Sequence, residues 1–304
     1  MSDQQPVAGV ERDPLKDLYT DWSEILATTP DLTMRLFRSI FDEWHQPTTE
    51  PADVTYAEET IGGIPGIWCR PNGADASRVL LYTHGGGFAV GSASSHRKLA
   101  AHFAKALGVQ SFVLDYRRAP EHPHPASLED ALSAFLALTE GGIAPGNITT
   151  IGDSAGGNLA VATALALQER GKPVPGSVIA MSPWLDMENK GETLVTNDAT
   201  DALITVGLLE GMIAGVLGDQ TSPTAPLANP LYADYSGFPR LYITAGGAES
   251  LLDNATRLND LAKAAGVDVT LSVVEGQQHV FPFNAGRTAA ADDQIAAIAK
   301  WYAG

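Results

Sequence analysis

A serine framed by glycines is the first group of residues whose spacing could carry chemistry. Residues 152–156 read G-D-S-A-G, with an apolar run, 148–151, before them and a stretch rich in alanine and leucine after them. A sharp strand-to-helix turn of this kind strains the serine backbone, exposes its Oγ and leaves no room for side chains two positions away. We therefore predict that Ser154 is a nucleophile, the alternative being an ordinary strand-to-helix turn. The N–H of Ala155, at the start of the new helix, would face negative charge at the serine.

Three consecutive glycines could bind the oxyanion of an acyl-transfer reaction. Residues 84–88 read H-G-G-G-F and follow the apolar run 78–83. Glycines expose backbone N–H groups, and acyl transfer needs such donors where the tetrahedral oxyanion forms. No G-K-[ST] follows, so the segment is not a P-loop. We expect His84 to hold the loop by hydrogen bonds to backbone, whereas Phe88 either lines the substrate pocket or packs in the core.

The general base is expected late in the chain, because hydrolases of this kind place serine, acid and histidine in that order. His279 is the one histidine after Ser154, and it follows the run 268–275. The acid, which fixes the imidazole tautomer and stabilises the imidazolium, should follow the preceding strand. Glu249 and Asp253 are the candidates there. We prefer Glu249, which is nearer the strand end, and expect Asp253 to be helical with a structural or capping role.

Alternating strands and helices would position these residues. Eight short apolar or β-branched runs are expected strands: 53–58, 64–70, 78–83, 111–116, 148–152, 177–182, 239–245 and 268–275. Helical spacing lies between or after the later runs, at 96–107, 125–139, 156–170, 251–265 and 287–302. This alternation predicts an α/β fold with a mostly parallel sheet and helices on both faces. Gly62 and Gly63 join the first two runs into an antiparallel hairpin at the sheet edge.

Helices outside this alternation predict a cap. Apolar positions at helical spacing occur over 14–26, and a second helix is expected to begin with Thr29 as N-cap and Pro30 as its first residue. More than fifty residues separate the runs 177–182 and 239–245, and they include a predicted helix at 204–217. Long intervals of this kind usually cover an active site. The expected domains are N-terminal cap helices 1–48, core 49–184, cap insertion 185–236 and core 237–304.

Composition excludes several classes of protein. The 304 residues carry a net charge of −17, which disfavours nucleic acid as a partner. The single cysteine, Cys69, allows no intrachain disulfide and no thiolate metal site, and we expect it to be buried in a strand. The N-terminus has no signal-peptide pattern and no stretch is long enough to span a membrane, so we expect a cytoplasmic protein.

Three motifs give the chain a resemblance to the bacterial hormone-sensitive-lipase-like esterases. They are the segments 84–88 and 152–156, together with D-Y-R-R-A-P-E-H-P-H-P-A at 115–126. The resemblance implies an α/β-hydrolase fold with an eight-stranded sheet, a helical cap and activity on short or medium acyl esters. It maps the acid onto Glu249, where many members have aspartate. It maps the oxyanion donors onto Gly86, Gly87 and Ala155, with Gly85 as a further candidate.

The sequence thus predicts a serine carboxyl-ester hydrolase that works through an acyl-enzyme and needs no cofactor or metal. Lactone hydrolysis is one alternative, since residues 275–283 resemble monoterpene lactone hydrolases, and a non-catalytic small-molecule receptor on the same fold is another. The partner would be a small ester or lactone, and the resemblance suggests a homodimer. Five residues are expected to line the substrate pocket: Phe88, Trp184, Leu185, Val280 and Phe281.

Overall fold

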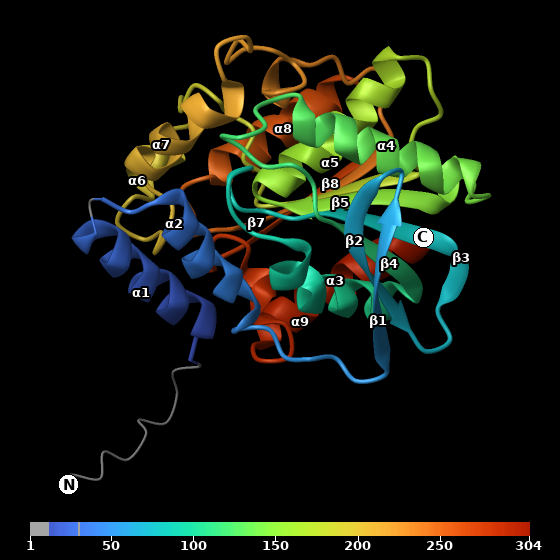
Figure 1. The fold of residues 1–304 in the computed structure, drawn as a ribbon, viewed down its shortest axis with the longest axis horizontal. Helices are drawn as coiled ribbons and strands as arrows, with labels where there is room; N and C mark the ends of the chain where they lie inside the picture. Colours follow the sequence, from blue (N-terminus) through green and yellow to red (C-terminus); the bar gives the residue numbers. More distant parts are fainter. Residues whose placement is uncertain (1–11, 30) are drawn as a thin grey trace, which may run out of the picture.

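One eight-stranded sheet runs through the computed structural model, which describes residues 12–29 and 31–304 (Figure 1). The strand order is β1-β2-β4-β3-β5-β6-β7-β8. The first two strands form an antiparallel hairpin, β2 is also antiparallel to β4, and every other neighbouring pair is parallel. The strands are β1 (Val54–Ile61), β2 (Ile64–Pro71), β3 (Asp75–Thr83), β4 (Val109–Leu114), β5 (Ile148–Asp153), β6 (Ser177–Met181), β7 (Arg240–Gly246) and β8 (Val269–Val274).

Helices cover both faces of this sheet. Figure 1 shows α3 (Ala93–Leu107) and α9 (Ala289–Ala303) on one face, and α4 (Ala126–Glu140), α5 (Ala155–Glu169) and α8 (Leu252–Ala264) on the other. The central strands β5 and β6 are buried along their whole length, as expected for strands that are covered on both sides. The predicted fold class, a mostly parallel eight-stranded sheet flanked by helices, is confirmed. Cys69 lies in β2, buried and unpaired as expected.

Four further helices lie together at one end of the molecule, at the left of Figure 1. They are α1 (Pro14–Thr28), α2 (Met34–Phe41), α6 (Thr193–Thr196) and α7 (Val206–Leu217). Ser23 of α1 donates a 2.6 Å hydrogen bond to the carbonyl of Ala202, so the N-terminal helices touch the long interval after β6. The predicted division into cap and core segments stays a prediction. The 3₁₀ turns are Asp42–His45 (η1), Pro145–Asn147 (η2), Pro230–Tyr232 (η3) and Phe281–Asn284 (η4).

The second N-terminal helix begins later than expected. Its N-cap is Thr33, whose side chain accepts a hydrogen bond from the N–H of Leu36. The predicted N-cap, Thr29, instead follows the last residue of α1, and Pro30 lies outside the described residues. The expectation was wrong because two threonines precede the same apolar face and both are good caps. The local sequence alone does not show which of the two threonines caps the helix.

Within residues 12–29 and 31–304, no helix combines the length and the apolar character that crossing a bilayer requires.

Candidate active site

Ser154 stands at a strained turn between β5 and α5. Its φ of 52° and ψ of −122° are unfavourable for a residue with a side chain. A Cβ at Gly152 would overlap with the carbonyl of Gly156, and a Cβ at Gly156 would overlap with that of Thr83. Both glycines of the motif are therefore required by close backbone approach. The turn is held from β6, because the N–H of Ser154 donates to the carbonyl of Met181 at 2.8 Å.

The glycine loop offers two free backbone donors, not three. Gly86 and Gly87 have φ angles of 108° and 58°, which only glycine adopts readily. No acceptor is found for their N–H groups in the described part of the chain. The N–H of Gly85 already donates to Asp153 Oδ1 at 3.2 Å. This corrects the expectation that Gly85 contributes to the oxyanion hole, and leaves Gly86, Gly87 and Ala155 as the candidate donors.

His84 supports the loop. Its Nδ1 lies 2.7 Å from the carbonyl of Gly85, and its ring stacks on Tyr116 with 4.2 Å between centroids. The hydroxyl of Tyr116 in turn donates to the His84 carbonyl at 2.7 Å. Burial, followed by the nearby His96, holds the pKa of His84 well below its usual value. His84 is therefore a neutral ring fixed to backbone, in keeping with the role expected for it.

His279 faces Glu249. Its Nδ1 lies 3.5 Å from Glu249 Oε1, and both side chains are fully buried. The carboxylate also accepts a 2.7 Å bond from the N–H of Gly246. Asp253 has other partners: its Oδ2 accepts from the N–H of Glu192 at 3.1 Å and lies 3.8 Å from Arg257. The geometry therefore favours Glu249 over Asp253 as the acid.

The ring of His279 is poised to act as a base. Burial alone would lower its pKa, but the hydrogen bond and the charge of Glu249, with the charges of Asp201 and Asp153, outweigh burial and raise the pKa above its usual value. Its Nε2 has no hydrogen-bond partner among the described residues. Catalytic hydrogen bonds are often loose in ligand-free enzymes. The free Nε2 is thus the atom available to take a proton from Ser154.

Ser182 joins the three parts of this site, and sequence reasoning missed its role. Its Oγ donates to Glu249 Oε2 at 2.6 Å and accepts from the N–H of Val280 at 3.0 Å. It follows Met181, the residue that holds the Ser154 turn, and it has a strained φ of 44°. The only signal in the sequence was its place at the end of the predicted strand 177–182.

Asp153 was also missed as a functional candidate. This fully buried carboxylate precedes Ser154, and its Oδ1 accepts from the Tyr82 hydroxyl at 2.7 Å as well as from the N–H of Gly85. Its Oδ2 lies 3.3 Å from His96 Nε2. Asp153 therefore ties the glycine loop to the nucleophile turn.

Comparison with known proteins identifies the family of the chain. Residues 80–283 match the model of a family described as alpha/beta hydrolase fold. The chain belongs to this family. It is 40% identical over 231 residues to an acetyl-hydrolase of Streptomyces hygroscopicus, covering 76% of this chain and 75% of that protein. It is 36% identical to an esterase of Acinetobacter venetianus, covering 84% of each. A crystal structure of an esterase from the bacterial hormone-sensitive lipase family superposes with a TM-score of 0.90 at 37% identity, over 96% of this chain and 98% of that one.

The five residues expected to line the pocket of this hydrolase are all buried. The rings of Phe88 and Trp184 lie 6.3 Å apart, next to the serine turn, since the N–H of Trp184 donates to the carbonyl of Ser154. Val280 and Phe281 follow His279, the candidate base. Leu185 instead packs into the core between α5 and α8. Its assignment to the pocket stays a prediction, as do those of the other four residues.

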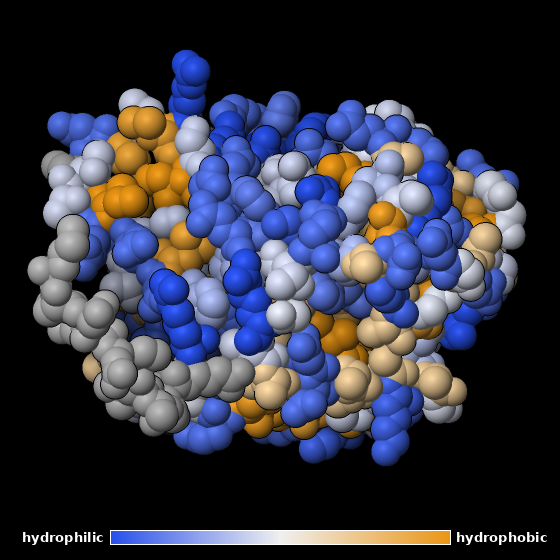
Figure 2. All heavy atoms as spheres, turned by 90° about the horizontal axis from the view of Figure 1, so that it is seen from below, coloured by the Kyte–Doolittle hydropathy of each residue, from blue (hydrophilic) through white to orange (hydrophobic). Residues whose placement is uncertain are grey.

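An apolar cavity of about 290 Å³ lies between α2 and α7. It is lined by Leu32, Met34, Phe37, Ala89, Pro120, Gly207, Leu208, Gly211, Met212 and Gly215. Figure 2 shows apolar surface gathered on the side of the molecule where these helices lie. A Cβ at Gly87 would overlap with the sulfur of Met212, so this cavity residue lies directly over the glycine loop. One wall of the cavity therefore contacts the glycine loop.

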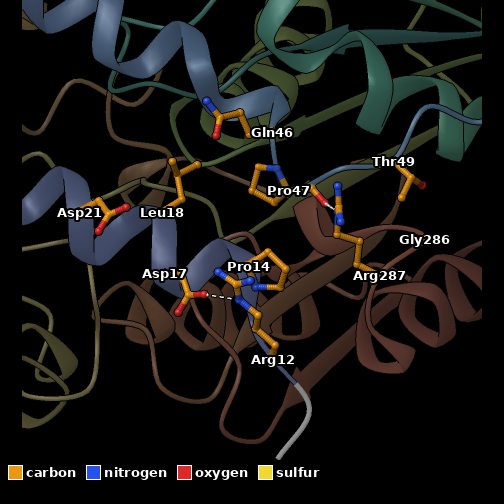
Figure 3. Close-up of a pocket in the computed structure, with 10 residues that line it drawn as sticks. All are labelled: Arg12, Pro14, Asp17, Leu18, Asp21, Gln46, Pro47, Thr49, Gly286 and Arg287. Atoms are coloured by element: carbon orange, nitrogen blue, oxygen red, sulfur yellow. Dashed lines mark hydrogen bonds and ion pairs between the residues drawn. The ribbon is translucent and has the colours of Figure 1, made fainter. Parts of the chain in front are cut away.

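A larger cleft, of about 610 Å³, lies elsewhere on the surface (Figure 3). It is bordered by α1 and by residues 46–49 and 286–287, and its two arginines already have partners. Arg12 pairs with Asp17 at 2.8 Å, and Arg287 donates to the carbonyl of Pro47 at 2.7 Å. None of the candidate catalytic residues lines it. None of them lines the smaller, apolar cavity either, but its Met212 contacts the glycine loop. The smaller cavity is therefore the better candidate for the substrate pocket.

Proposed function

We propose that this chain hydrolyses small carboxyl esters at Ser154, with His279 as general base and Glu249 as the acid that orients it. The observation that supports this most strongly is the buried His279–Glu249 pair, joined through Ser182 to the strand end that holds the Ser154 turn. The chain is a serine carboxyl-ester hydrolase of the alpha/beta hydrolase family, like the esterases it resembles.

The reaction proceeds in two acyl-transfer steps. His279 Nε2 takes the proton of Ser154 as Oγ attacks the ester carbonyl, and the C–O bond to the alcohol breaks as His279 returns that proton to the leaving oxygen. Water then attacks the acyl-enzyme, again giving its proton to His279, and the bond from the acyl carbon to Ser154 Oγ breaks as His279 returns that proton to Oγ. The N–H groups of Gly86, Gly87 and Ala155 stabilise the oxyanion in both steps.

Glu249 keeps His279 in the tautomer with the proton on Nδ1. This leaves Nε2 unprotonated and able to act as a base, and the carboxylate stabilises the imidazolium that forms in each step. Its own charge is held by two donors, Ser182 Oγ and the N–H of Gly246. No cofactor takes part in these steps.

The substrate is an ester with a short or medium acyl chain. The cavity between α2 and α7 is apolar and reaches Met212 above the glycine loop. Its volume of about 290 Å³ is at the low end of ligand pockets, which suits a small hydrocarbon group better than a long one. The surrounding cap helices would exclude water from the reacting carbonyl.

A lactone hydrolase remains an alternative prediction, because a cyclic ester would use the same serine, base and oxyanion donors. A non-catalytic receptor remains the alternative of another class. An esterase or a lactone hydrolase differs from a receptor in one testable respect: the enzyme needs a reactive serine and the receptor does not.

The test compares wild type with Ser154→Ala on p-nitrophenyl esters from acetate to palmitate, with a panel of lactones in parallel. We expect turnover of the short and medium esters by wild type and none above background by the variant. Mass spectrometry after treatment with diethyl p-nitrophenyl phosphate should place one diethylphosphoryl group on Ser154. Full activity in a clean Ser154→Ala preparation would refute the proposal.

A further inference from the structure

The peptide unit that follows the catalytic histidine is held at both of its polar ends. The hydroxyl of Tyr19, in α1, donates a 3.0 Å hydrogen bond to the carbonyl of His279. On the other side, the N–H of Val280 donates to Ser182 Oγ, also at 3.0 Å. In the part of the chain that the structure describes, Tyr19 is the only donor to this carbonyl. The N-terminal helix thus touches the base directly, across 260 residues of sequence.

This peptide unit leads into a strained residue. Val280 has φ 51° and ψ 44°, the left-handed region that β-branched residues avoid. Such a conformation persists only where its surroundings over-determine it. The two hydrogen bonds to the His279–Val280 peptide hold Val280 in this conformation, because rotation of the peptide would break both. The direction in which the imidazole leaves the backbone depends on the same rotation.

Tyr19 is itself built as a fixed donor. Its side chain is fully buried, and its oxygen accepts a 3.0 Å hydrogen bond from Trp44 Nε1. Since Trp44 occupies the oxygen, the proton of the hydroxyl points to the His279 carbonyl. Burial raises the pKa of Tyr19 well above its usual value, so the hydroxyl keeps its proton throughout the working range of an esterase. Trp22 and Trp44 pack against the tyrosine ring, with centroids 5.8 and 6.3 Å away.

We propose that Tyr19 is a positioning residue for the base: it fixes the His279–Val280 peptide and thereby aims the imidazole at Ser154. The N-terminal helices are then part of the catalytic arrangement, in addition to covering the substrate. This inference rests on the proposed function, since it assumes that His279 is the base.

Loss of the Tyr19 hydroxyl should reduce the chemical step and not substrate binding. The peptide would lose one of its two restraints, the strain at Val280 could relax, and the imidazole would leave the geometry needed for proton transfer. Small misplacements of a reacting group lower rates strongly, and we expect kcat to fall about tenfold. Tyr19 does not line the apolar cavity, so KM should stay within about twofold of wild type.

The experiment compares Tyr19→Phe with the matched control Tyr235→Phe. Tyr235 is also buried, and its hydroxyl also donates a 3.0 Å bond to a backbone carbonyl, that of Pro230, outside the candidate site. Each variant is measured for kcat and KM on p-nitrophenyl butyrate, for the rate of phosphorylation by diethyl p-nitrophenyl phosphate, and for unfolding in urea. The phosphorylation rate reports the reactivity of the serine without depending on ester turnover.

The proposal is supported if both variants lose similar stability while only Tyr19→Phe loses kcat and phosphorylation rate at unchanged KM. Equal loss of kcat in both variants, wild-type kcat in Tyr19→Phe, or a change confined to KM would overturn it. Should Tyr19→Phe not fold, Trp44→Phe decides, because it frees the hydroxyl to rotate away from the carbonyl. A kcat about threefold lower at unchanged KM then supports the proposal, and wild-type kcat overturns it.

Failure of the proposed function gives a different result. An active Ser154→Ala would remove the serine mechanism whatever Tyr19→Phe does. An inactive Ser154→Ala together with a fully active, folded Tyr19→Phe would leave the proposed function standing and reject only the role of Tyr19.

Discussion

The hydroxyl of Ser182 donates a 2.6 Å hydrogen bond to Glu249 Oε2. The same oxygen accepts the N–H of Val280, the residue after the candidate base. One buried hydroxyl at the end of β6 therefore holds the acid and the turn of the base in a fixed relation. This contact links two separate loops, since Glu249 follows β7 and His279 follows β8.

Removal of this hydroxyl should weaken both stability and catalysis. Ser182→Ala leaves the N–H of Val280 without its acceptor and Glu249 with one donor fewer, at a cost of about 1–3 kcal/mol in the free energy of unfolding. We expect kcat to fall about 10- to 100-fold, the usual effect of losing a partner that orients a functional group. Ser177→Ala is the control, since Ser177 begins β6, the strand that ends just before Ser182, and its buried Oγ is 2.8 Å from Thr149 Oγ1. If the two variants lose the same activity, Ser182 is only structural.

The pH dependence of activity should follow the raised pKa of His279. The base works only when unprotonated, so kcat/KM rises with pH through that pKa. The midpoint of this rise, the acid limb of the pH profile, should lie above the ordinary histidine pKa of about 6.5. Glu249→Gln removes the charge that raises the pKa and leaves burial, which lowers it. The limb then moves to lower pH, while kcat falls by about 10³–10⁴ because the imidazole loses its orientation.

Asp253→Asn is the matched control for this pH experiment. Asp253 bonds to the N–H of Glu192 and lies near Arg257, away from the base. Its variant should keep both the acid limb and kcat. A collapse of kcat in Asp253→Asn with little change in Glu249→Gln would reverse the assignment of the acid.

The sheet could be predicted from the sequence because its strands are short apolar runs between clear breaks. The eight runs match the eight strands to within a few residues, and Gly62 and Gly63 join the one hairpin. The nucleophile turn was equally local, since the clash that requires Gly152 and Gly156 arises within the strand-turn-helix unit and its neighbouring strand. Features that depend on only a few neighbouring residues could therefore be predicted from the sequence.

Contacts between residues far apart in the sequence could not be predicted. The three glycines after His84 look alike in sequence, and only the approach of Asp153, 68 residues away, shows that Gly85 has no free N–H. Ser182 and Tyr19 are ordinary residue types whose roles depend on where loops and α1 pack. Thr29 was misassigned for the same reason: two threonines could cap the second helix locally, and the cap is Thr33.

The glycine face of α7 should set the length of the acyl chain. Gly207 and Gly211 line the apolar cavity, and a Cβ at either position would meet no atom within 4 Å. Gly211→Leu should therefore fill the cavity without a clash, and its better helix propensity should leave stability equal or higher by about 0.8–1 kcal/mol. We expect kcat/KM on p-nitrophenyl octanoate to fall at least about tenfold while acetate is hydrolysed as before. Ala214→Leu, on an exposed part of the same helix, is the control and should leave the chain-length profile unchanged.

Gly87 should be intolerant of a methyl group for two separable reasons, strain and contact. Its φ is 58°, and a Cβ there would overlap with the sulfur of Met212. Gly73 has a similar φ of 76° with no atom within 4 Å, so Gly73→Ala measures strain alone, about 1–2 kcal/mol in unfolding free energy with activity unchanged. Gly87→Ala should also lower kcat about 10²–10³-fold, because movement of the loop displaces an oxyanion donor. Adding Met212→Ala removes the contact but not the strain, and should restore part of kcat without restoring stability. If the double variant is as slow as Gly87→Ala, the contact with the cap does not limit the loop, and backbone strain alone accounts for the loss.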